Sequence, residues 1–354
     1  MTIDLQAFGA TADLVTQAKT VSGQMLARVT AQHRELYQVM TTQGSRPAQV
    51  AGRLSHELRQ PTDFPAVGDW VAVTATQSPA MIQRILPRQS VLIRGAVGQA
   101  GGQVIAANVD TIFICMSLNA NFNVRRIERY LTMAWDSGAV PVVVLTKADL
   151  CANVAAKLAE LAPVTLGVDV LTCSAQTGAG IASLKAYVTG NQTVSFIGSS
   201  GVGKSTLINQ LLGSDQLATR AIRADDDKGR HATTARELLR LPAGGVVIDT
   251  PGMRELQVQG GNLDQAFADI TALASHCKFR NCTHQTEPGC AVQAALATGQ
   301  LEAERLASYQ KLQRELAYNG MNARERENAK IARAFGSKRA MKQVMDHVKR
   351  EKRR

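Results

Sequence analysis

The chain has 354 residues, enough for two or three domains that each bury a core of their own. Its 45% hydrophobic and 19% charged residues exclude a disordered protein. Met1–Thr20 has no cationic start followed by an apolar run, and the longest apolar stretches are too short to cross a bilayer. We therefore expect a soluble, cytoplasmic protein that does not contact a membrane.

The net charge of +11 is concentrated near the C-terminus. Between Met321 and Arg354 there are twelve Lys and Arg residues and four Asp and Glu residues, a balance of +8. Clustered cations release counterions when they contact phosphates, so this basic tail at 321–354 predicts a nucleic-acid-binding arm. A solvated helix or a frayed end remains the alternative.

Residues 1–20 are interpreted as an N-terminal extension and residues 21–107 as a small β domain. Short β segments alternate there with Gly and Pro, including Gly44 and Pro47, which we expect in turns. Five strands in this length favour a barrel of the oligonucleotide-binding (OB) type, and a purely structural barrel remains open. The glycine-rich residues 95–103 predict a loop or linker. The predicted strands are Gly23–Ala31, Glu35–Met40, Ala48–Leu54, Asp69–Thr74 and Met81–Leu86.

From residue 108 to 261, apolar strands alternate with helices, which predicts an α/β fold whose sheet is covered on both faces. The predicted strands are Thr111–Ser117, Pro141–Thr146, Val168–Cys173, Thr193–Gly198, Arg236–Leu241 and Gly245–Thr250. The predicted helices are Val124–Ser137, Ala152–Leu161, Gly180–Thr189 and Lys204–Leu212. Beyond Gly261 the chain is expected to be helical, with long charged helices from Ala291 onward that break near Asn319–Gly320 and Gly336.

The first motif is Thr146-Lys147-Ala148-Asp149, which is typical of guanine recognition. The Asp149 carboxylate can accept hydrogen bonds from N1–H and the 2-amino group of guanine, donors that adenine lacks. Lys147 is expected over the base, and the pair Ser174-Ala175 follows as the second base-contacting segment. Thr146 stands where Asn is usual and can make one hydrogen bond to a neighbouring loop, so we expect weaker affinity with specificity kept.

A phosphate-binding loop comes next, between an apolar strand and a helix. Its glycines allow backbone N–H groups to surround the phosphates at the start of the helix. Lys204 would bridge the β and γ phosphates, and Ser205 would hold Mg²⁺. The loop and the residue after it read Gly198-Ser199-Ser200-Gly201-Val202-Gly203-Lys204-Ser205-Thr206.

The remaining nucleotide residues follow the phosphate loop. Asp249, at the end of a strand, would hold Mg²⁺, and the N–H of Gly252 would contact the γ-phosphate. The polar stretch before it is typical of a switch loop in which Thr233 or Thr234 reaches Mg²⁺. Met253 replaces the usual water-orienting Gln, so either His231 or a partner must orient the water, and intrinsic hydrolysis is expected to be slow.

These motifs are rotated along the chain. An ordinary GTPase has the phosphate loop first and the guanine-reading motif near its end, whereas Asp149 here precedes Lys204. All parts of a guanine-nucleotide switch are present in a permuted order. We therefore expect a circularly permuted P-loop GTPase domain at 108–261.

Three cysteines and one histidine cluster between residues 277 and 290. Cys277, Cys282, His284 and Cys290 provide three thiolates and one imidazole, a complete tetrahedral set for one structural Zn²⁺. With four protein ligands no position is left for water, so a catalytic zinc is not expected. Residues 262–320 are interpreted as an α-helical zinc-binding domain.

Further segments join these motifs in one family resemblance. They are Phe64–Val73, Ile105–Asp110, Asn123–Leu131 and Asp249–Glu255. From about residue 20 to 320 the chain resembles the ribosome small subunit-dependent GTPases (the RsgA/YjeQ family). The resemblance implies an OB domain, a permuted GTPase and a zinc domain, together with binding to the 30S subunit late in its assembly. It also implies that the 30S particle stimulates GTP hydrolysis and that His231 is the catalytic residue.

We therefore expect a monomeric GTPase that converts GTP to GDP with Mg²⁺ and binds the 30S subunit and its 16S rRNA. Three alternatives remain open: an RNA-binding scaffold whose nucleotide is a structural element, a divergent paralogue with an altered role, and a metabolic ATPase. Asp149 argues against the ATPase, because ATP would leave its desolvated carboxylate unpaired.

Overall fold

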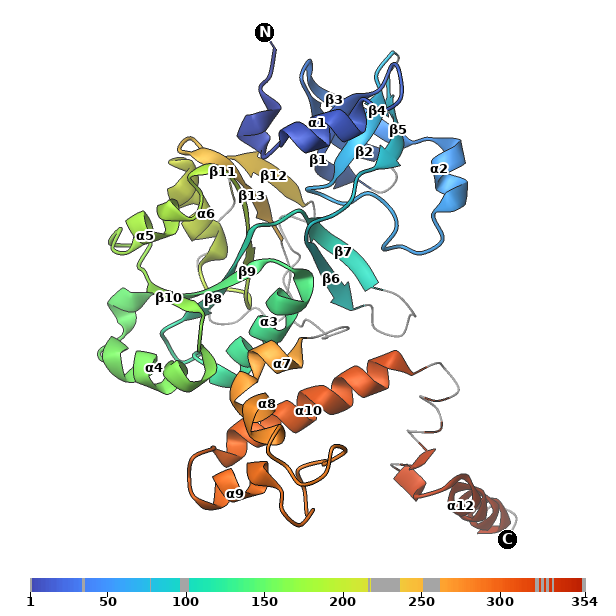
Figure 1. Ribbon diagram of the computed structural model, residues 1–354, viewed down its shortest axis with the longest axis vertical. Coiled ribbons are helices and arrows are strands. Elements are labelled where there is room, and N and C mark those ends of the chain that lie inside the picture. The colour runs from blue at the N-terminus through green and yellow to red at the C-terminus, as the bar shows by residue number, and fades with distance from the viewer. Residues whose placement is uncertain are drawn as a thin grey trace.

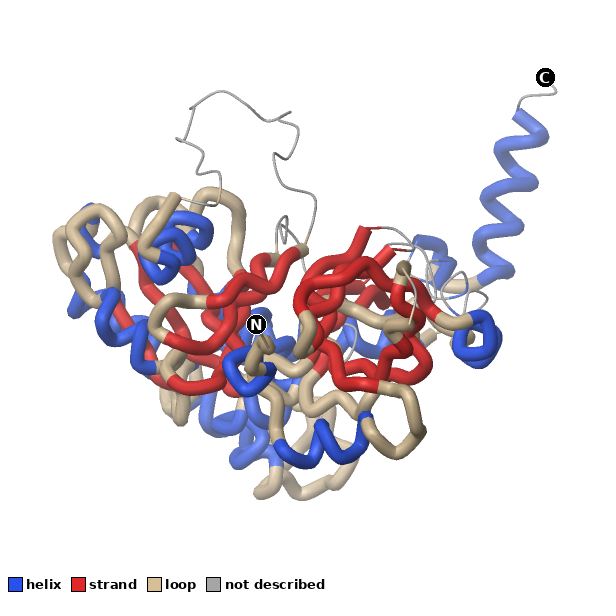
Figure 2. Tube along the Cα trace, turned by 90° about the horizontal axis from the view of Figure 1, so that it is seen from above, coloured by secondary structure: helices blue, strands red, loops and turns tan. Residues whose placement is uncertain are grey.

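The computed structural model describes residues 2–33, 36–76, 78–95, 102–215, 217, 236–250, 262–321, 325, 328, 331–332 and 334–351. Figure 1 shows a β-barrel at one end, an α/β sheet in the middle and a helical part at the other end. Seen from above in Figure 2, the barrel and the α/β sheet lie side by side. Within the described ranges, no helix is long and apolar enough to cross a membrane.

Two short helices near the N-terminus pack on the core. In both the 3-10 helix η1 (Leu5–Phe8) and α1 (Ala12–Ala18), a side-chain oxygen caps the N-terminus, from Asp4 and Thr11 respectively. The apolar faces of both helices are buried: Leu5, Phe8, Leu14 and Ala18. The segment interpreted as an extension thus contributes side chains to the core.

The predicted five-stranded barrel is confirmed. Its strands are β1 (Met25–His33), β2 (Leu36–Thr41), β3 (Gly44–Val50), β4 (Trp70–Thr74) and β5 (Ala80–Ile85). They pair in the order β1-β2-β3-β5-β4, and β4 returns to β1, which closes the barrel. Fully buried side chains such as Val29, Val39 and Ile82 fill its interior. Closure leaves no free edge within the barrel.

Two predictions in the barrel region are wrong. The strand predicted at Ala48–Leu54 is β3 at Gly44–Val50, and a helix, α2 (Gly52–Glu57), begins where the strand was expected to continue. Gly44 and Pro47 therefore lie in a strand and not in turns. Pro47 is tolerated because β3 pairs with β5 only from Ala48 onward, so its missing N–H is not needed on that side.

The prediction of a loop at 95–103 is also wrong at both ends of this range. β6 (Val91–Gly95) and β7 (Gly102–Ala107) form a two-stranded antiparallel sheet in which Gly95 pairs with Gly102. Residues 96–101 lie outside the described residues. The hairpin covers the junction between the barrel and the α/β sheet, where Val104 and Ala107 are buried against Ala66.

The α/β sheet matches the predicted alternation of strands and helices. Its strands are β8 (Thr111–Ser117), β9 (Val140–Thr146), β10 (Asp169–Thr172), β11 (Gly190–Ile197), β12 (Glu237–Arg240) and β13 (Gly244–Asp249). They pair in the order β10-β9-β8-β11-β13-β12, and β12 alone among them runs antiparallel to its neighbour. The helices and 3-10 turns between them are α3 (Val124–Ser137), η2 (Ala148–Leu150), α4 (Val154–Leu161), η3 (Ala162–Val164), α5 (Ile181–Ala186) and α6 (Lys204–Leu212).

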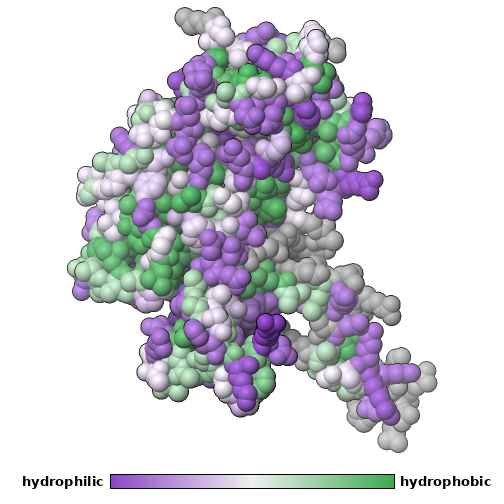
Figure 3. Space-filling view, viewed as in Figure 1, coloured by the Kyte–Doolittle hydropathy of each residue, from purple (hydrophilic) through white to green (hydrophobic). Residues whose placement is uncertain are grey.

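Apolar side chains cover both faces of this sheet, as predicted. One face carries Ile112 and Ile114, and the other carries Phe113 and Phe196 in a separate cluster. On the molecular face drawn in Figure 3, apolar residues gather around α4. Leu150, Leu158 and Leu166 are exposed large apolar residues of this segment.

The barrel and the α/β sheet are continuous. β12 pairs with β1 through Ala31 and Glu237, which gives one sheet of eleven strands. Arg28 of β1 is buried at the junction and donates hydrogen bonds to the carbonyl oxygens of Phe8, Gly68 and Asn108 and to Thr193 Oγ1. Burial lowers the pKa of Arg28 to about 10, so it stays charged at neutral pH. One guanidinium thus fixes the N-terminal segment, the barrel and β11 to one another.

The C-terminal part is helical, with one difference from the prediction. Its helices are α7 (Leu263–Ala266), α8 (Ala268–Ala274), α9 (Ala291–Ala297), α10 (Ala303–Gly320) and α12 (Lys338–Glu351). The helix expected to be long from Ala291 ends at Ala297, and Gly299 in the left-handed conformation precedes α10. The predicted breaks at Gly320 and Gly336 are confirmed. In Figures 1 and 2, α12 stands apart from the rest of the molecule.

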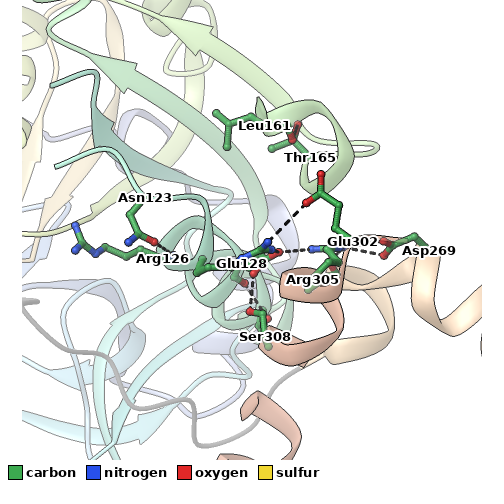
Figure 4. A network of polar contacts seen from close by, with 12 residues as sticks. Asn123, Arg126, Glu128, Leu161, Thr165, Asp269, Glu302, Arg305 and Ser308 are labelled. Carbon is green, nitrogen blue, oxygen red and sulfur yellow. Dashed lines mark hydrogen bonds and ion pairs between the residues drawn. The ribbon is translucent and has the colours of Figure 1, made fainter. Parts of the chain in front are cut away.

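A buried ion-pair network joins the helical part to α3 (Figure 4). Glu128 of α3 is fully buried and accepts hydrogen bonds from Arg305 at 2.8 Å, Ser308 at 2.6 Å and Arg125 at 2.6 Å. Arg305 of α10 also donates two hydrogen bonds to Asp269 of α8. A buried carboxylate with three donors is well satisfied, so the network fixes α10 and α8 on α3.

Candidate functional site

Parallel strands bring the predicted nucleotide motifs to one edge of the sheet. β9, β8, β11 and β13 run in the same direction. The residues that end or follow them therefore share an edge, which is the ligand-binding edge of open α/β sheets. Thr146 ends β9, Gly198 follows β11 and Asp249 ends β13.

The loop between β11 and α6 has the geometry of a phosphate loop. Gly198 has a φ of 147°, and a Cβ there would lie 2.5 Å from the carbonyl oxygen of Cys115, so only glycine fits. Lys204 Nζ donates to the carbonyl oxygens of Gly198 at 2.7 Å and Ser199 at 2.9 Å. Burial lowers the pKa of the Lys204 ammonium, and Asp249 is among the groups that oppose the shift. The lysine is thus held inside the loop where phosphates would bind.

The guanine-reading segment contacts the phosphate loop directly. Thr146 Oγ1 donates to the carbonyl oxygen of Val202 at 2.6 Å, and Lys147 Nζ donates to that of Gly201 at 2.8 Å. The single hydrogen bond expected from Thr146 to a neighbouring loop is therefore present. Two segments more than fifty residues apart in the chain form one surface.

The predicted second base-contacting segment, Ser174-Ala175, lies beside the first. Ala148 N–H donates to the carbonyl oxygen of Cys173 at 3.1 Å, and the buried Ser174 accepts from Thr177 N–H through its hydroxyl at 3.2 Å. Gly180 closes this loop where a Cβ would meet the carbonyl oxygen of Thr172 at 2.1 Å. Asp149 lies in η2 and is exposed, so its carboxylate is accessible to a ligand.

Candidate magnesium ligands flank the phosphate loop. Ser205 lies in the first turn of α6, and the buried Asp249 ends the neighbouring strand. Burial raises the pKa of the Asp249 carboxyl, while Lys204 lowers it. Thr250 is fixed by its hydroxyl, which donates to the carbonyl oxygen of Phe196 at 2.7 Å. A serine hydroxyl and a carboxylate are oxygen donors of the kind that Mg²⁺ prefers.

Several predicted site residues lie outside the described residues. They are the catalytic candidate His231, the magnesium candidates Thr233 and Thr234, and the γ-phosphate candidate Gly252. The residues that border the segments containing them are described. The first ends at Arg236, which donates to the Val104 carbonyl oxygen and to Gln103 Oε1 of β7. The second runs from Thr250 to the start of α7.

One residue beside the phosphate loop was not predicted as part of the site. Arg126, in the first turn of α3, donates from Nη1 to Ser199 Oγ at 3.3 Å. The side chain of Asn123 caps this helix by accepting from Arg126 N–H. Arg126 lies in the segment Asn123–Leu131, which carries part of the family resemblance. Its contact with the phosphate loop depends on how α3 packs beside β11, which the sequence does not show.

The four predicted metal ligands converge in the loop between α8 and α9. The ligand atoms of Cys277, Cys282, His284 and Cys290 all lie within 4.8 Å of one another. Cys277 Sγ lies 3.7 Å from His284 Nδ1 and 3.9 Å from Cys290 Sγ. Tetrahedral zinc with bonds of about 2.0–2.3 Å requires ligand separations of about 3.5–3.8 Å. The donor set fits a closed zinc site.

Backbone N–H groups at the start of α9 stabilise the thiolates. Gln293 N–H donates to Cys290 Sγ at 3.4 Å. Burial opposes ionisation of Cys277, but hydrogen bonds from Val292 and Ala291 hold the pKa of its thiol below the ordinary value. Such hydrogen bonds orient metal-bound cysteines.

The permuted order of motifs, the sheet topology and the five-stranded barrel define a circularly permuted P-loop GTPase with an OB-like domain. The family model of the RsgA GTPase matches residues 85–259. Relatives named as small ribosomal subunit biogenesis GTPases include one from Lactiplantibacillus plantarum, 58% identical over 99% of this chain and 100% of its own length. Another, from Oceanobacillus iheyensis, is 44% identical over 87% of this chain and 88% of its own length. The chain belongs to the RsgA family of GTPases.

Solved structures agree with the fold. The crystal structure of YjeQ from Thermotoga maritima has a TM-score of 0.62 and 25% identity, and covers 84% of this chain and 100% of its own. The circularly permuted GTPase YloQ has a TM-score of 0.60 at 22% identity, and covers 86% of this chain and 99% of its own. The expected circular permutation and the OB-like barrel are thus confirmed.

Proposed function

We propose that this GTPase couples GTP hydrolysis to late maturation of the small ribosomal subunit, which it binds through ribosomal RNA in a nucleotide-dependent way. The observation that carries the proposal is the 58% identity, over 99% of the chain, with a protein named for biogenesis of that subunit. The assembled nucleotide edge supports it. The proposal places a monomer in the cytoplasm, where ribosomal subunits mature.

Within this proposal the base-reading residue is Asp149. Thr146 and Lys147 hold its loop on the phosphate loop, and Ala148 N–H ties it to Cys173. Ser174 and Ala175 would form the other side of the base pocket. ATP offers no N1–H or 2-amino group, so its adenine would leave the carboxylate unpaired. ATP that displaced GTP at equal concentration in a competition assay would contradict this assignment.

The phosphates would bind in the loop Gly198–Ser205, with Thr206 next in the helix. Lys204 Nζ would exchange its two carbonyl partners for phosphate oxygens, and backbone N–H groups at the start of α6 would donate to the same anions. Ser205, Asp249 and Thr233 or Thr234 would hold Mg²⁺, which neutralises charge on the β and γ phosphates. Gly252 N–H would contact the γ-phosphate, and His231 would position the attacking water.

Zn²⁺ in this proposal is structural. The ion would be held by Cys277, Cys282, His284 and Cys290 and would supply a rigid cross-link between α8 and α9. All four positions are taken by protein atoms, so none is left for a reacting water.

The connections of the two γ-phosphate-sensing segments explain how the nucleotide would control RNA binding. The segment containing His231 leads into β12, which pairs with β1 of the barrel. The segment containing Gly252 leads into α7, which packs on α3. Ordering of both segments by GTP would therefore act on the barrel and on the helical part, and the basic tail would add phosphate contacts.

The experiment is binding of the full-length protein to purified 30S subunits with a non-hydrolysable GTP analogue, with GDP and without nucleotide. We expect binding to be tightest with the analogue. Lys204→Ala removes the phosphate contact and should abolish the difference between the nucleotides. Nucleotide-independent binding of the unaltered protein would favour the alternative of an RNA-binding scaffold.

A further inference from the structure

The metal-cluster loop presents an aromatic side chain on the surface. Phe279 lies two residues after Cys277 and is 41% exposed. Lys278 and Arg280 on either side of it are also exposed. A single exposed apolar side chain is common on protein surfaces and needs no explanation. A phenyl ring between two cations has the chemistry of a nucleic-acid contact, because it combines a stacking face with phosphate-binding charges.

The backbone around Phe279 is rigidly held. Cys282 N–H donates to the Phe279 carbonyl oxygen at 3.2 Å, which closes a tight turn with Arg280 near its tip. Lys278 N–H donates to the Gly289 carbonyl oxygen at 3.1 Å, which ties this turn to the second half of the loop. A side chain presented on a fixed backbone loses little conformational entropy when it binds.

The second half of the loop is fixed by Glu287. Its carboxylate accepts hydrogen bonds from the backbone N–H groups of Thr283 at 2.8 Å and Gln285 at 2.9 Å, and from the Thr283 hydroxyl. These bonds, the one from the Thr283 hydroxyl first, lower the pKa of Glu287 to about 2. Both halves are therefore ordered around the metal ligands and hold the ring in place.

A positive charge lies beside the exposed ring. Lys278 Nζ lies over the Phe279 ring at 5.6 Å from its centroid. Because Phe279 is 41% exposed, part of the ring is accessible to a flat ligand. Figure 1 draws this loop in orange between α8 and α9, at the end of the molecule farthest from the barrel. A ligand there would extend the binding surface well beyond the barrel.

We propose that Phe279 is a stacking platform for an unpaired base of single-stranded ribosomal RNA, with Lys278 and Arg280 contacting the flanking phosphates. This inference rests on the proposed binding to the small subunit. Unpaired RNA bases stack readily on aromatic side chains, whereas bases within a duplex do not expose their faces. An apolar pocket of a ribosomal protein is the competing occupant, and it would have no need of two cations beside the ring.

The test measures the affinity of zinc-loaded full-length variants for purified 30S subunits in the presence of the GTP analogue. Phe279→Ala should weaken binding by at least about fivefold, the lower range for loss of one stacked base. Phe279→Tyr keeps the aromatic face and should bind like the unaltered protein. Phe279→Leu keeps apolar bulk without a flat π face and should bind like Phe279→Ala. Full affinity of the Leu variant would overturn RNA stacking in favour of a protein pocket.

A direct readout uses Phe279→Trp and a short single-stranded oligoadenosine. Stacking of adenine on the new indole should quench its fluorescence, and a duplex of the same length should not. Absence of quenching by the single strand would overturn the proposal.

The cations are tested separately by salt dependence. Lys278→Gln and Arg280→Gln should each reduce the slope of log K against log salt by about 0.7, the value for one phosphate contact on a single strand. Unchanged slopes would overturn the assigned phosphate contacts.

Controls separate this inference from the proposed function. Zinc content and GTP affinity should be unchanged in each variant, because Phe279 ligates no metal and lies outside the nucleotide edge. If the unaltered protein does not bind 30S subunits, the proposed function fails. If it binds them and Phe279→Ala binds equally well, only the stacking platform fails.

Discussion

Thr146 determines how the guanine-reading loop meets the phosphate loop. It is 3% exposed, and its hydroxyl donates to the Val202 carbonyl oxygen at 2.6 Å. Lys147 makes the parallel contact with Gly201. A buried carbonyl without a donor is costly, so this hydroxyl stabilises the shape that the phosphate loop has in the structure.

Replacement of Thr146 by Val should weaken GTP binding. The substitution keeps the shape and leaves the Val202 carbonyl unpaired, which costs about 1–2 kcal/mol, or roughly a 5- to 30-fold increase in Kd. Thr146→Ser retains a hydroxyl and is the matched control. Isothermal titration with GTP measures both variants. Equal affinity of the Val and Ser variants would show that the bond has no role in binding.

At the scale of elements, α3 connects the nucleotide edge with the helical part. Its first turn reaches the phosphate loop through Arg126 and Ser199. One turn later, Glu128 pairs with Arg305 of α10, and Arg129 pairs with Glu315 through two hydrogen bonds of 2.7 and 2.9 Å. Because packed helices move as rigid units, a displacement of α3 would change its contacts with both the phosphate loop and α10.

Arg305→Ala tests the strength of this connection. The substitution removes the only cation that α10 places against the fully buried Glu128 among the described residues, and breaking a buried pair costs about 3–5 kcal/mol in the free energy of unfolding. Lys157→Ala breaks the exposed pair with Glu160 and should cost at most about 1 kcal/mol. Denaturant unfolding of the two variants gives the comparison. A loss for Arg305→Ala no larger than that for Lys157→Ala would mean that the network does not hold α10 on α3.

Elements with strong periodicity were predictable from the sequence, and those that depend on tertiary pairing were not. β8, α3 and α6 have the predicted bounds, since each is a clear apolar run or an amphipathic helix with a cap. The hairpin β6–β7 was missed, because two short strands without alternation gain their stability only from each other and from the junction. Pro47 was wrongly predicted to lie in a turn. A strand position that needs no backbone N–H can be recognised only when the pairing with the neighbouring strands is known.

The site shows the same division. The placement of Lys204 and Asp149 at one edge of the sheet and the convergence of the four candidate metal ligands could be predicted from spacing, because phosphate loops, guanine motifs and zinc clusters require fixed intervals along the chain. The binding roles of these residues stay predictions. The contacts of Arg126 with Ser199 and of Glu128 with Arg305 join residues 73 and 177 positions apart, so no local pattern reveals them. Roles proposed for His231, Thr233 and Thr234 stay predictions.

At the scale of the whole molecule, the barrel, the GTPase sheet and the helical part are joined at two places. β1 pairs with β12 on one side, and the helical part packs on α3 on the other. Both joints lie next to a segment that would sense the γ-phosphate. Under the proposed function, a change in the nucleotide would therefore reach both ends of the molecule.

Removal of the metal should loosen the helical part without loss of the nucleotide edge. Cys290 caps the start of α9 and belongs to the metal cluster, so chelation should reduce the hydrogen-exchange protection of α9 while β8 and β11 keep theirs. Cys282→Ser should reproduce the effect, whereas Cys151→Ser, outside the cluster, should not. Full protection of α9 after chelation would contradict a structural metal.

The most direct test of the whole account is the turnover of GTP with 30S subunits, with 50S subunits and with neither. A nucleotide switch matched to the maturing small subunit predicts slow hydrolysis alone, marked stimulation by 30S subunits and none by 50S subunits. Turnover that is unchanged by 30S subunits, or raised equally by both particles, would contradict it.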